Sequence, residues 1–293
     1  MDTDALIDVV VCRDRDECSE LALVLAAQAI PARARGDGRS WVLSVPAESL
    51  ARARLEIEAY RTESKLSRTA RPAVPAEGRP WPGIALSTAA LLLMGLLAPA
   101  THFGVDWLAL GRMDGGRMLA GEWWRPVTAL TLHADSAHLL GNIGFGAFFA
   151  YSVTRYLGAG FGWLAIVATG ALGNIANGLL AGPDHRSIGA STAVFAALGL
   201  LSAYLWRRGF RSDASRRERI APIAAGIGLL AFTGTGGVDT DIGAHLFGFV
   251  AGFAGGLVVA RAGFPRARTA QTLSACAAGA IVAAAWAIAI ALG

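Results

Sequence analysis

One serine, two histidines and one asparagine occur in segments of the chain that are otherwise apolar or small. Ser191 follows a Gly-Ala pair, His245 lies in the sequence Gly-Ala-His-Leu-Phe-Gly, and His138 precedes Asn142 by four residues. A hydroxyl is a weak nucleophile until a base accepts its proton, and histidine commonly serves as that base. These residue types predict acyl transfer, with Ser191 as the nucleophile and His245 as the base.

The same reaction needs hydrogen-bond donors for the oxyanion of its tetrahedral intermediate. His138 and Asn142 would share one face of a helix because they are four residues apart. A ring N–H of His138, the side-chain amide of Asn142 and the backbone N–H of Ser191 could supply these donors. We therefore expect an oxyanion hole formed by these three residues.

The elements that must position these residues are membrane-spanning helices. The 293-residue chain is 54% hydrophobic and only 16% charged, with a mean hydropathy of +0.47. A bilayer core needs about 20 apolar residues per helix. Seven segments, each almost free of charge, meet this need: 83–100, 137–157, 161–181, 190–206, 220–235, 242–260 and 270–292.

The arginines predict how these spans are oriented, because cytoplasmic loops retain Lys and Arg. Basic residues gather before the first span, in 207–219 after the fourth, and in 261–268 after the sixth, which places these regions on one side. The second, fourth and sixth spans then begin at the outer face. His138, Ser191 and His245 are therefore expected at a similar shallow depth.

The connection 101–136 is expected to lie outside the membrane. Its Trp107, Trp123 and Trp124 have amphipathic rings that suit the membrane interface. Arg125 is expected to organise this loop through hydrogen bonds rather than to act in catalysis.

A stripe of glycines in the sixth span predicts close helix packing. Gly248, Gly252 and Gly256 recur at intervals of four residues. Small residues at this spacing let membrane helices approach closely. Gly199, on the serine face of the fourth span, is the expected partner, and this approach would bring the serine and the histidine together.

Residues 1–65 predict a small soluble α/β domain. Strand-like and helical patterns alternate in the order β-α-β-α, with room for an additional strand near Arg33. The Pro- and Arg-rich residues 66–82 are expected to form a linker. Cys12 and Cys18 fit buried small side chains better than a metal pair, because no second pair of ligands accompanies them. A regulatory, docking or folding module is favoured over a ligand sensor.

The membrane part, from about residue 84 to 262, resembles the six-helix core of the rhomboid family of intramembrane serine proteases. This resemblance implies an all-α polytopic membrane protein, with a six-helix rhomboid core at 83–262 and a seventh transmembrane helix within 263–293, preceded by the small soluble α/β domain. It is carried by the order and spacing of short motifs: Trp124-Arg125, His133, His138 with Asn142, Gly189 to Ser191, and Ala244-His245 followed by Gly248.

The resemblance also implies roles for individual residues. Ser191 and His245 match the catalytic dyad of the family, which works without an acid, and His138, Asn142 and the Ser191 backbone match its oxyanion donors. Phe195 occupies the position of the aromatic residue that supports the catalytic ring. The remaining matches are supporting positions, namely Gly189, Gly248, Trp124, Arg125 and His133.

The implied activity is cleavage of single-span membrane proteins near the outer face of the membrane. The Ala- and Arg-rich composition favours a bacterial inner membrane, and the arginine placement predicts that the N-terminal domain is cytoplasmic. The expected partners are these substrates, membrane lipids and a cytoplasmic partner of the N-terminal domain, with no nucleic acid, metal or organic cofactor. Thr192 departs from the family pattern, which usually has glycine there, and a β-branched residue could crowd the oxyanion pocket. The alternative is an inactive relative that binds transmembrane helices for quality control or trafficking.

A zinc site is the main chemical alternative to serine chemistry, because His133, His138, His185 and His245 all lie near the expected outer face. The chain has no His-Glu-x-x-His motif and no acidic residue within the spans to act as a base, which disfavours this alternative. His185, in Gly-Pro-Asp-His-Arg, is expected in a solvated turn.

Polar residues in the third span raise the question of a transport path. Asn174 and Asn177 are expected to form interhelical hydrogen bonds instead. A transporter or channel would need polar residues across the full depth of the membrane, whereas the fourth and sixth spans are apolar or glycine-lined in their cytoplasmic halves. A cavity closed at its base is therefore favoured.

Overall fold

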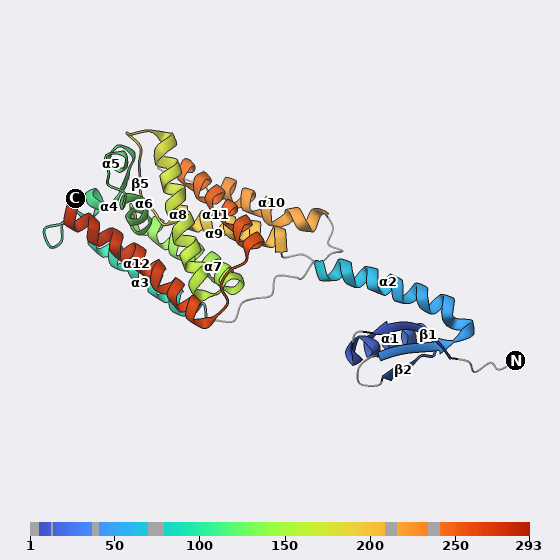
Figure 1. Ribbon diagram of the computed structural model, residues 1–293. Helices are drawn as coiled ribbons and strands as arrows, with labels where there is room; N and C mark the ends of the chain where they lie inside the picture. Colours follow the sequence, from blue (N-terminus) through green and yellow to red (C-terminus); the bar gives the residue numbers. More distant parts are fainter. Residues whose placement is uncertain (1–5, 13, 37–40, 70–78, 209–215, 234–240) are drawn as a thin grey trace. The chain divides into compact units, whose positions relative to one another are not determined.

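The computed structural model describes residues 6–12, 14–36, 41–69, 79–208, 216–233 and 241–293 (Figure 1). The chain divides into two compact units, residues 1–71 and 72–293. Three sequence-based expectations fall partly outside the described residues: the linker, the basic segment after the fourth span, and the end of the fifth span.

The N-terminal unit is a three-stranded antiparallel sheet with two helices, as expected for a small α/β region. Asp14 begins the first helix by accepting a hydrogen bond from the backbone N–H of Glu17. Both helices and the central strand contribute apolar side chains to one core, in which Cys12 and Cys18 are also buried. The strand near Arg33 is present, and the sheet order is β1-β3-β2. The elements are β1 (Leu6–Cys12), α1 (Arg15–Ala27), β2 (Arg33–Gly36), β3 (Trp41–Pro46), a 3-10 turn (Ala47–Ser49) and α2 (Leu50–Thr69).

The second unit is helical, and each of the seven predicted spans overlaps one of its helices. These are α3 (Trp81–Leu97), α7 (Ser136–Leu157), α8 (Ala159–Ala181), α9 (Ser191–Arg208), α10 (Arg216–Thr233), α11 (Ile242–Ala262) and α12 (Arg268–Leu292). Among the described helices, α8, α11 and α12 are long and apolar enough to cross a membrane, and α3 is apolar but shorter. A mainly helical membrane protein preceded by a small α/β region is therefore confirmed.

The connection between α3 and α7 contains short elements that pack against α8 and α12. These are α4 (Trp107–Gly111), β4 (Met113–Asp114), α5 (Gly115–Leu119), α6 (Arg125–Thr128) and a 3-10 turn (Ala129–Thr131), with β4 pairing with β5 (Arg186–Ser187). Trp124 is only 8% exposed and packs against Ala285 and Ala289 of α12, so protein covers most of this ring. Trp123, in contrast, is 55% exposed.

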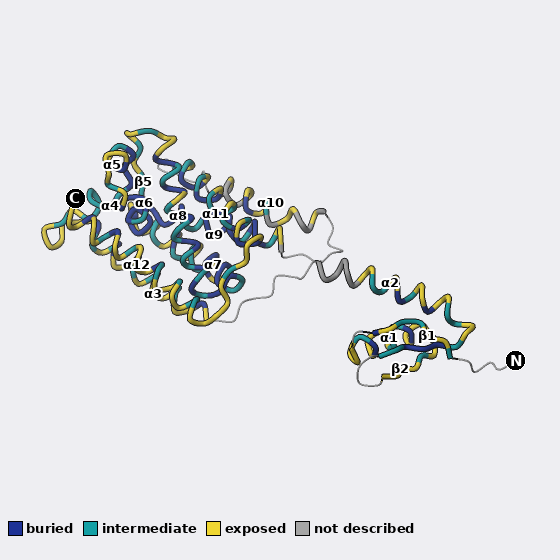
Figure 2. The backbone as a smooth tube through the Cα atoms, in the orientation of Figure 1, coloured by how far each residue is buried: buried dark blue, intermediate teal, exposed yellow. Residues whose placement is uncertain are grey.

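Helices α9 and α11 run parallel and touch through their backbones. A Cβ on any of the three stripe glycines would clash with a carbonyl oxygen of α9, and Gly199 likewise faces the backbone of α11. The predicted close packing is confirmed, and Figure 2 shows buried residues concentrated on α8, α9 and α11. The contacts pair Gly248 with Thr192, Gly252 with Ala196, and Gly256 with Leu200.

Helix α12 is joined to the turn between α7 and α8 by one side chain that the sequence analysis missed. The Gln271 carbonyl oxygen accepts hydrogen bonds from the backbone N–H groups of Gly160 and Phe161, at 2.8 and 2.9 Å. The Gln271 amide donates to the carbonyls of Leu157 and Pro265. These bonds satisfy N–H groups at the start of α8 that have no partner within that helix.

Candidate active site

Ser191 is the first residue of α9, and Gly189 shapes the approach to it. Gly189 has φ +136°, a conformation that strongly favours glycine. A Cβ at Gly189 would lie 2.8 Å from Nε2 of His138 and 3.3 Å from the Ser191 hydroxyl. The Ser191 hydroxyl and the His138 ring therefore border the same small volume, which only a glycine leaves open.

The start of α7 supplies the two expected oxyanion donors. Asp135 caps this helix by accepting a hydrogen bond from the backbone N–H of His138, at 2.8 Å. One turn later Asn142 is buried, and its side-chain NH₂ group has no partner among the described residues. An unpaired buried donor is costly unless a ligand uses it. Asn142 therefore retains donor capacity beside the His138 face of the helix.

His133 anchors the segment that leads to Ser191. Its Nε2 accepts a hydrogen bond from the backbone N–H of Ala190, at 3.4 Å, while the N–H of Gly189 donates to the carbonyl of Ala129 at 3.0 Å. Burial is the main cause that lowers the pKa of His133 to about 4, and the nearby His138 ring lowers it further. The His133 ring is therefore neutral near pH 7 and keeps the lone pair that accepts this bond.

His245 is the fourth residue of α11 and is 7% exposed. Its ring packs against Phe195 of α9, with the ring centroids 4.5 Å apart, and its Nδ1 has no hydrogen-bond partner in the described structure. The described residues contain no hydrogen bond between the Ser191 hydroxyl and the His245 ring. Such contacts are commonly long in unliganded sites and shorten with substrate.

Thr192 lies in the seam between three helices. Its side chain is 2% exposed, and its methyl group is 3.0 Å from the Cβ position of Gly173 on α8 and 3.1 Å from that of Gly248 on α11. The residue that departs from the family pattern thus packs between two glycines. Its methyl group has a structural role there.

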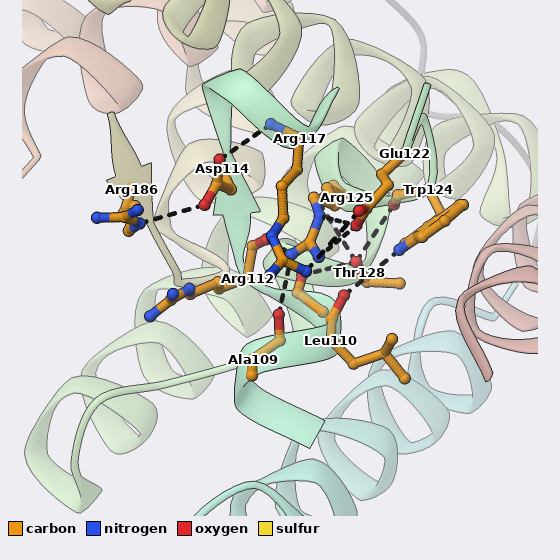
Figure 3. Close-up of polar contacts among 11 residues, drawn as sticks. Ala109, Leu110, Arg112, Asp114, Arg117, Glu122, Trp124, Arg125, Thr128 and Arg186 are labelled. Atoms are coloured by element: carbon orange, nitrogen blue, oxygen red, sulfur yellow. Dashed lines mark hydrogen bonds and ion pairs between the residues drawn. The ribbon is translucent and has the colours of Figure 1, made fainter. Parts of the chain in front are cut away.

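Arg125 organises the loop below these helices, as Figure 3 shows. The guanidinium is fully buried and donates to the carbonyls of Ala109 and Arg112, at 3.0 and 2.8 Å, and to the carboxylate of Glu122. The Thr128 hydroxyl donates to the carbonyl of Gly111 at 2.6 Å. All of these contacts are internal to the loop, so Arg125 has no direct contact with Ser191 or His245.

Asp114 connects this loop to the segment that precedes Ser191. Burial would raise the pKa of its carboxyl group, but hydrogen bonds from the Arg117 backbone and the Arg186 side chain lower it below the usual value. Asp114 is therefore ionised near neutral pH and pairs with Arg186 at 3.2 Å. This pair reinforces the two-residue ladder between β4 and β5.

His185 directly follows a turn at residues 183–184, but the expectation that its side chain is solvated is wrong. Its Nε2 is 3.0 Å from the Asp241 carboxylate, and its side chain is only 15% exposed. The Asn177 amide donates to the same carboxylate at 2.9 Å, and Asn174 donates to the carbonyl of Pro126. Asp241 caps the apolar helix that follows it. That N-cap pattern could have been recognised in the sequence.

The helical unit that contains Ser191 and His245 is similar to known proteins. The rhomboid domain model matches residues 120–262. The chain is 35% identical over 136 residues to the putative rhomboid protease YdcA of Bacillus subtilis (strain 168), covering 45% of this chain and 65% of YdcA. It is 35% identical over 94 residues to the rhomboid protease GluP of the same organism, covering 32% of this chain and 18% of GluP. The chain therefore spans less than two thirds of each relative.

Proposed function

Because this chain belongs to the rhomboid family, we propose that it is a serine-type endopeptidase that cleaves single-span membrane proteins within the membrane, near its outer surface. The observation that carries the proposal is the arrangement around Gly189, where the Ser191 hydroxyl and the His138 ring border one small volume. This volume suits a tetrahedral intermediate, which needs a nucleophile and a donor on adjacent sides.

In the proposed first step, His245 accepts the hydroxyl proton of Ser191 as the oxygen attacks the scissile carbonyl. Contact with Phe195 fixes the plane of the His245 ring, and the unpaired Nδ1 leaves that ring without an acid partner. Asp241 is the nearest acidic residue along α11, but its carboxylate is engaged by Ala244, His185 and Asn177. A dyad therefore fits these contacts better than a triad.

The oxyanion would be held by the backbone N–H of Ser191, the His138 ring and the amide of Asn142. The unpaired amide of Asn142 supports this role, because a preorganised donor needs no rearrangement as charge develops. The acyl-enzyme would then be hydrolysed by a water that His245 activates. A substrate helix must unwind locally first, because intact helices engage their carbonyls in hydrogen bonds.

We further propose that the protein resides in a bacterial inner membrane with the N-terminal unit in the cytoplasm. The clustering of basic residues before α3, after α9 and after α11 supports this orientation. It would place Ser191 and His245 toward the outer face.

A fluorophosphonate probe applied to the purified protein in detergent tests the proposed chemistry directly. The wild type is expected to be labelled, while Ser191→Ala and His245→Ala lose labelling. Ser274→Ala is the matched control, because its hydroxyl bonds only within α12. Labelling that survives Ser191→Ala would contradict the assignment. A folded wild type that is not labelled would favour the inactive helix-binding relative.

A further inference from the structure

Three polar side chains from distant parts of the sequence meet where α11 begins. Asp241 is the residue that caps α11, His185 precedes β5, and Asn177 lies in the last turns of α8. The Asp241 oxygen Oδ2 is 3.0 Å from Nε2 of His185 and 2.9 Å from Nδ2 of Asn177. The Asn177 Nδ2 also lies 2.9 Å from Nε2 of His185, so the three side chains contact one another in pairs. When Nε2 of His185 carries a proton, its contact with the Asp241 carboxylate is a charge-assisted hydrogen bond.

Asp241 organises the turn of α11 that carries His245. Its second oxygen, Oδ1, accepts a hydrogen bond from the backbone N–H of Ala244, at 3.0 Å. Its main-chain carbonyl accepts from the N–H of His245 itself, at 3.2 Å. A carboxylate at this position also stabilises the positive end of the helix dipole. The conformation of the His245 backbone thus depends directly on Asp241.

His185 is fixed to the segment that carries Ser191. Its carbonyl accepts a hydrogen bond from the N–H of Gly115, at 3.0 Å, and β5 follows it directly in the ladder with β4. Ser191 lies six residues after His185, and His245 lies four residues after Asp241. The contact between these two side chains therefore joins the approach to the nucleophile with the approach to the base.

A glycine in the first turn of α11 leaves room for the Asn177 side chain beside Asp241. Gly243 follows Asp241 by two residues, and a Cβ there would lie 2.5 Å from the side-chain oxygen Oδ1 of Asn177. A larger residue at 243 would therefore displace the Asn177 side chain from its place beside Asp241. Asn177 donates to Oδ2 of Asp241, while the backbone N–H of Ala244 donates to Oδ1.

We propose that Asp241 and His185 form a latch that positions His245 relative to Ser191. Asp241 is a positioning residue, since its carboxylate contacts neither of those two side chains. The proposal rests on the proposed function, because it assigns the latch to the same serine–histidine chemistry. Loss of the latch would leave both residues in place but widen the distribution of their separations, which slows a reaction that depends on their alignment.

The first test is a double-mutant cycle on the rate of fluorophosphonate labelling. His185→Ala is expected to slow labelling about tenfold, and Asp241→Ala at least as much, because Asp241 also caps α11. The double variant is expected to be no slower than Asp241→Ala, because both changes remove the same contact between His185 and Asp241. Asp241→Asn keeps the helix cap and is expected to restore part of the rate. Asp184→Ala is the matched control, since this exposed carboxylate makes no polar contact with the other described residues. Multiplicative losses in the double variant would refute the latch.

The second test does not depend on proteolysis. Hydrogen–deuterium exchange of the full chain is expected to increase in residues 186–190 when Asp241 is changed to Ala, although those residues are distant in sequence. Unchanged exchange there would overturn the latch even if the enzyme is active. An unlabelled wild type whose exchange responds as expected would instead remove the proposed function and leave the physical coupling in place.

Discussion

Replacing Thr192 by glycine would restore the usual pattern of the family, and the structure predicts that this change is harmful. The threonine methyl group occupies the seam between Gly173 and Gly248, and the side chain is 2% exposed. Its removal leaves space that two glycines cannot fill. A simple view of the family pattern predicts the opposite, namely a gain of activity when the bulky residue is removed.

The expected cost follows from the atoms that are lost. Removal of about two buried carbon groups, with the cavity that remains, costs roughly 2 kcal/mol, and glycine in a helix adds a few tenths of a kcal/mol. Packing losses of this kind apply within membranes as well, because contacts between helices there depend on close packing. For a unit of this size the loss corresponds to a fall in Tm of about 5–10 °C.

Thermal unfolding in detergent and fluorophosphonate labelling measure the two consequences together. Thr192→Gly is expected to lower Tm and to slow labelling roughly threefold to tenfold, because the seam also sets the separation of α9 and α11. Thr192→Val replaces the hydroxyl but keeps a methyl group in the seam, so it leaves a smaller cavity and is expected to lower Tm less than Thr192→Gly. Thr192→Ser, which removes only the methyl group, should fall between them. Faster labelling of Thr192→Gly with an unchanged Tm would refute this reasoning.

Three further predictions concern packing, docking of the last helix and pH. Gly252→Ala should strongly lower Tm, because its Cβ would clash with a backbone carbonyl oxygen of α9. Gly279→Ala, at a position that faces open space, should not lower Tm. Equal effects of the two changes on Tm would contradict the close packing of α9 and α11. Gln271→Ala leaves two backbone N–H groups of α8 unpaired and should cost about 2 kcal/mol, while Thr272→Ala on the same helix should cost much less; thermal unfolding distinguishes them. Because burial lowers the pKa of His133 to about 4, the unfolded state binds a proton first as the pH falls below about 6.5. The stability contributed by neutral His133 should therefore be present at pH 7 and decline toward pH 4, and His133→Gln should flatten that decline in Tm; parallel pH curves would count against it.

The sequence predicted features that depend on local pattern. The starts of α7, α9 and α11 follow from apolar periodicity and arginine placement, so the positions of His138, Ser191 and His245 near helix starts could be derived from the sequence alone. The glycine stripe likewise predicted backbone contact, because spacing by four residues marks one helical face whatever its partner.

Contacts between polar groups far apart in the sequence could not be predicted in this way. Gln271 bonds to a turn more than a hundred residues earlier, and His185 meets Asp241 only because α8, β5 and α11 converge. The solvated side chain expected for His185 failed for the same reason. Local polarity indicates that a residue needs a partner or water, but tertiary packing decides which it receives.

The three glycines of α11 also determine the position of α11 along the axis of α9. Residues 248, 252 and 256 meet α9 at a constant offset, and the positions one turn beyond them, Ala244 and Ala260, both carry a Cβ. Sliding α11 by one turn, about 6 Å, in either direction would bring one of these methyl groups against a carbonyl that now faces a glycine. The two helices therefore pack in a single register, because a shift by one turn in either direction produces a steric clash. The backbone contact between α9 and α11 thus sets the position of His245 relative to Ser191 along the helix axes.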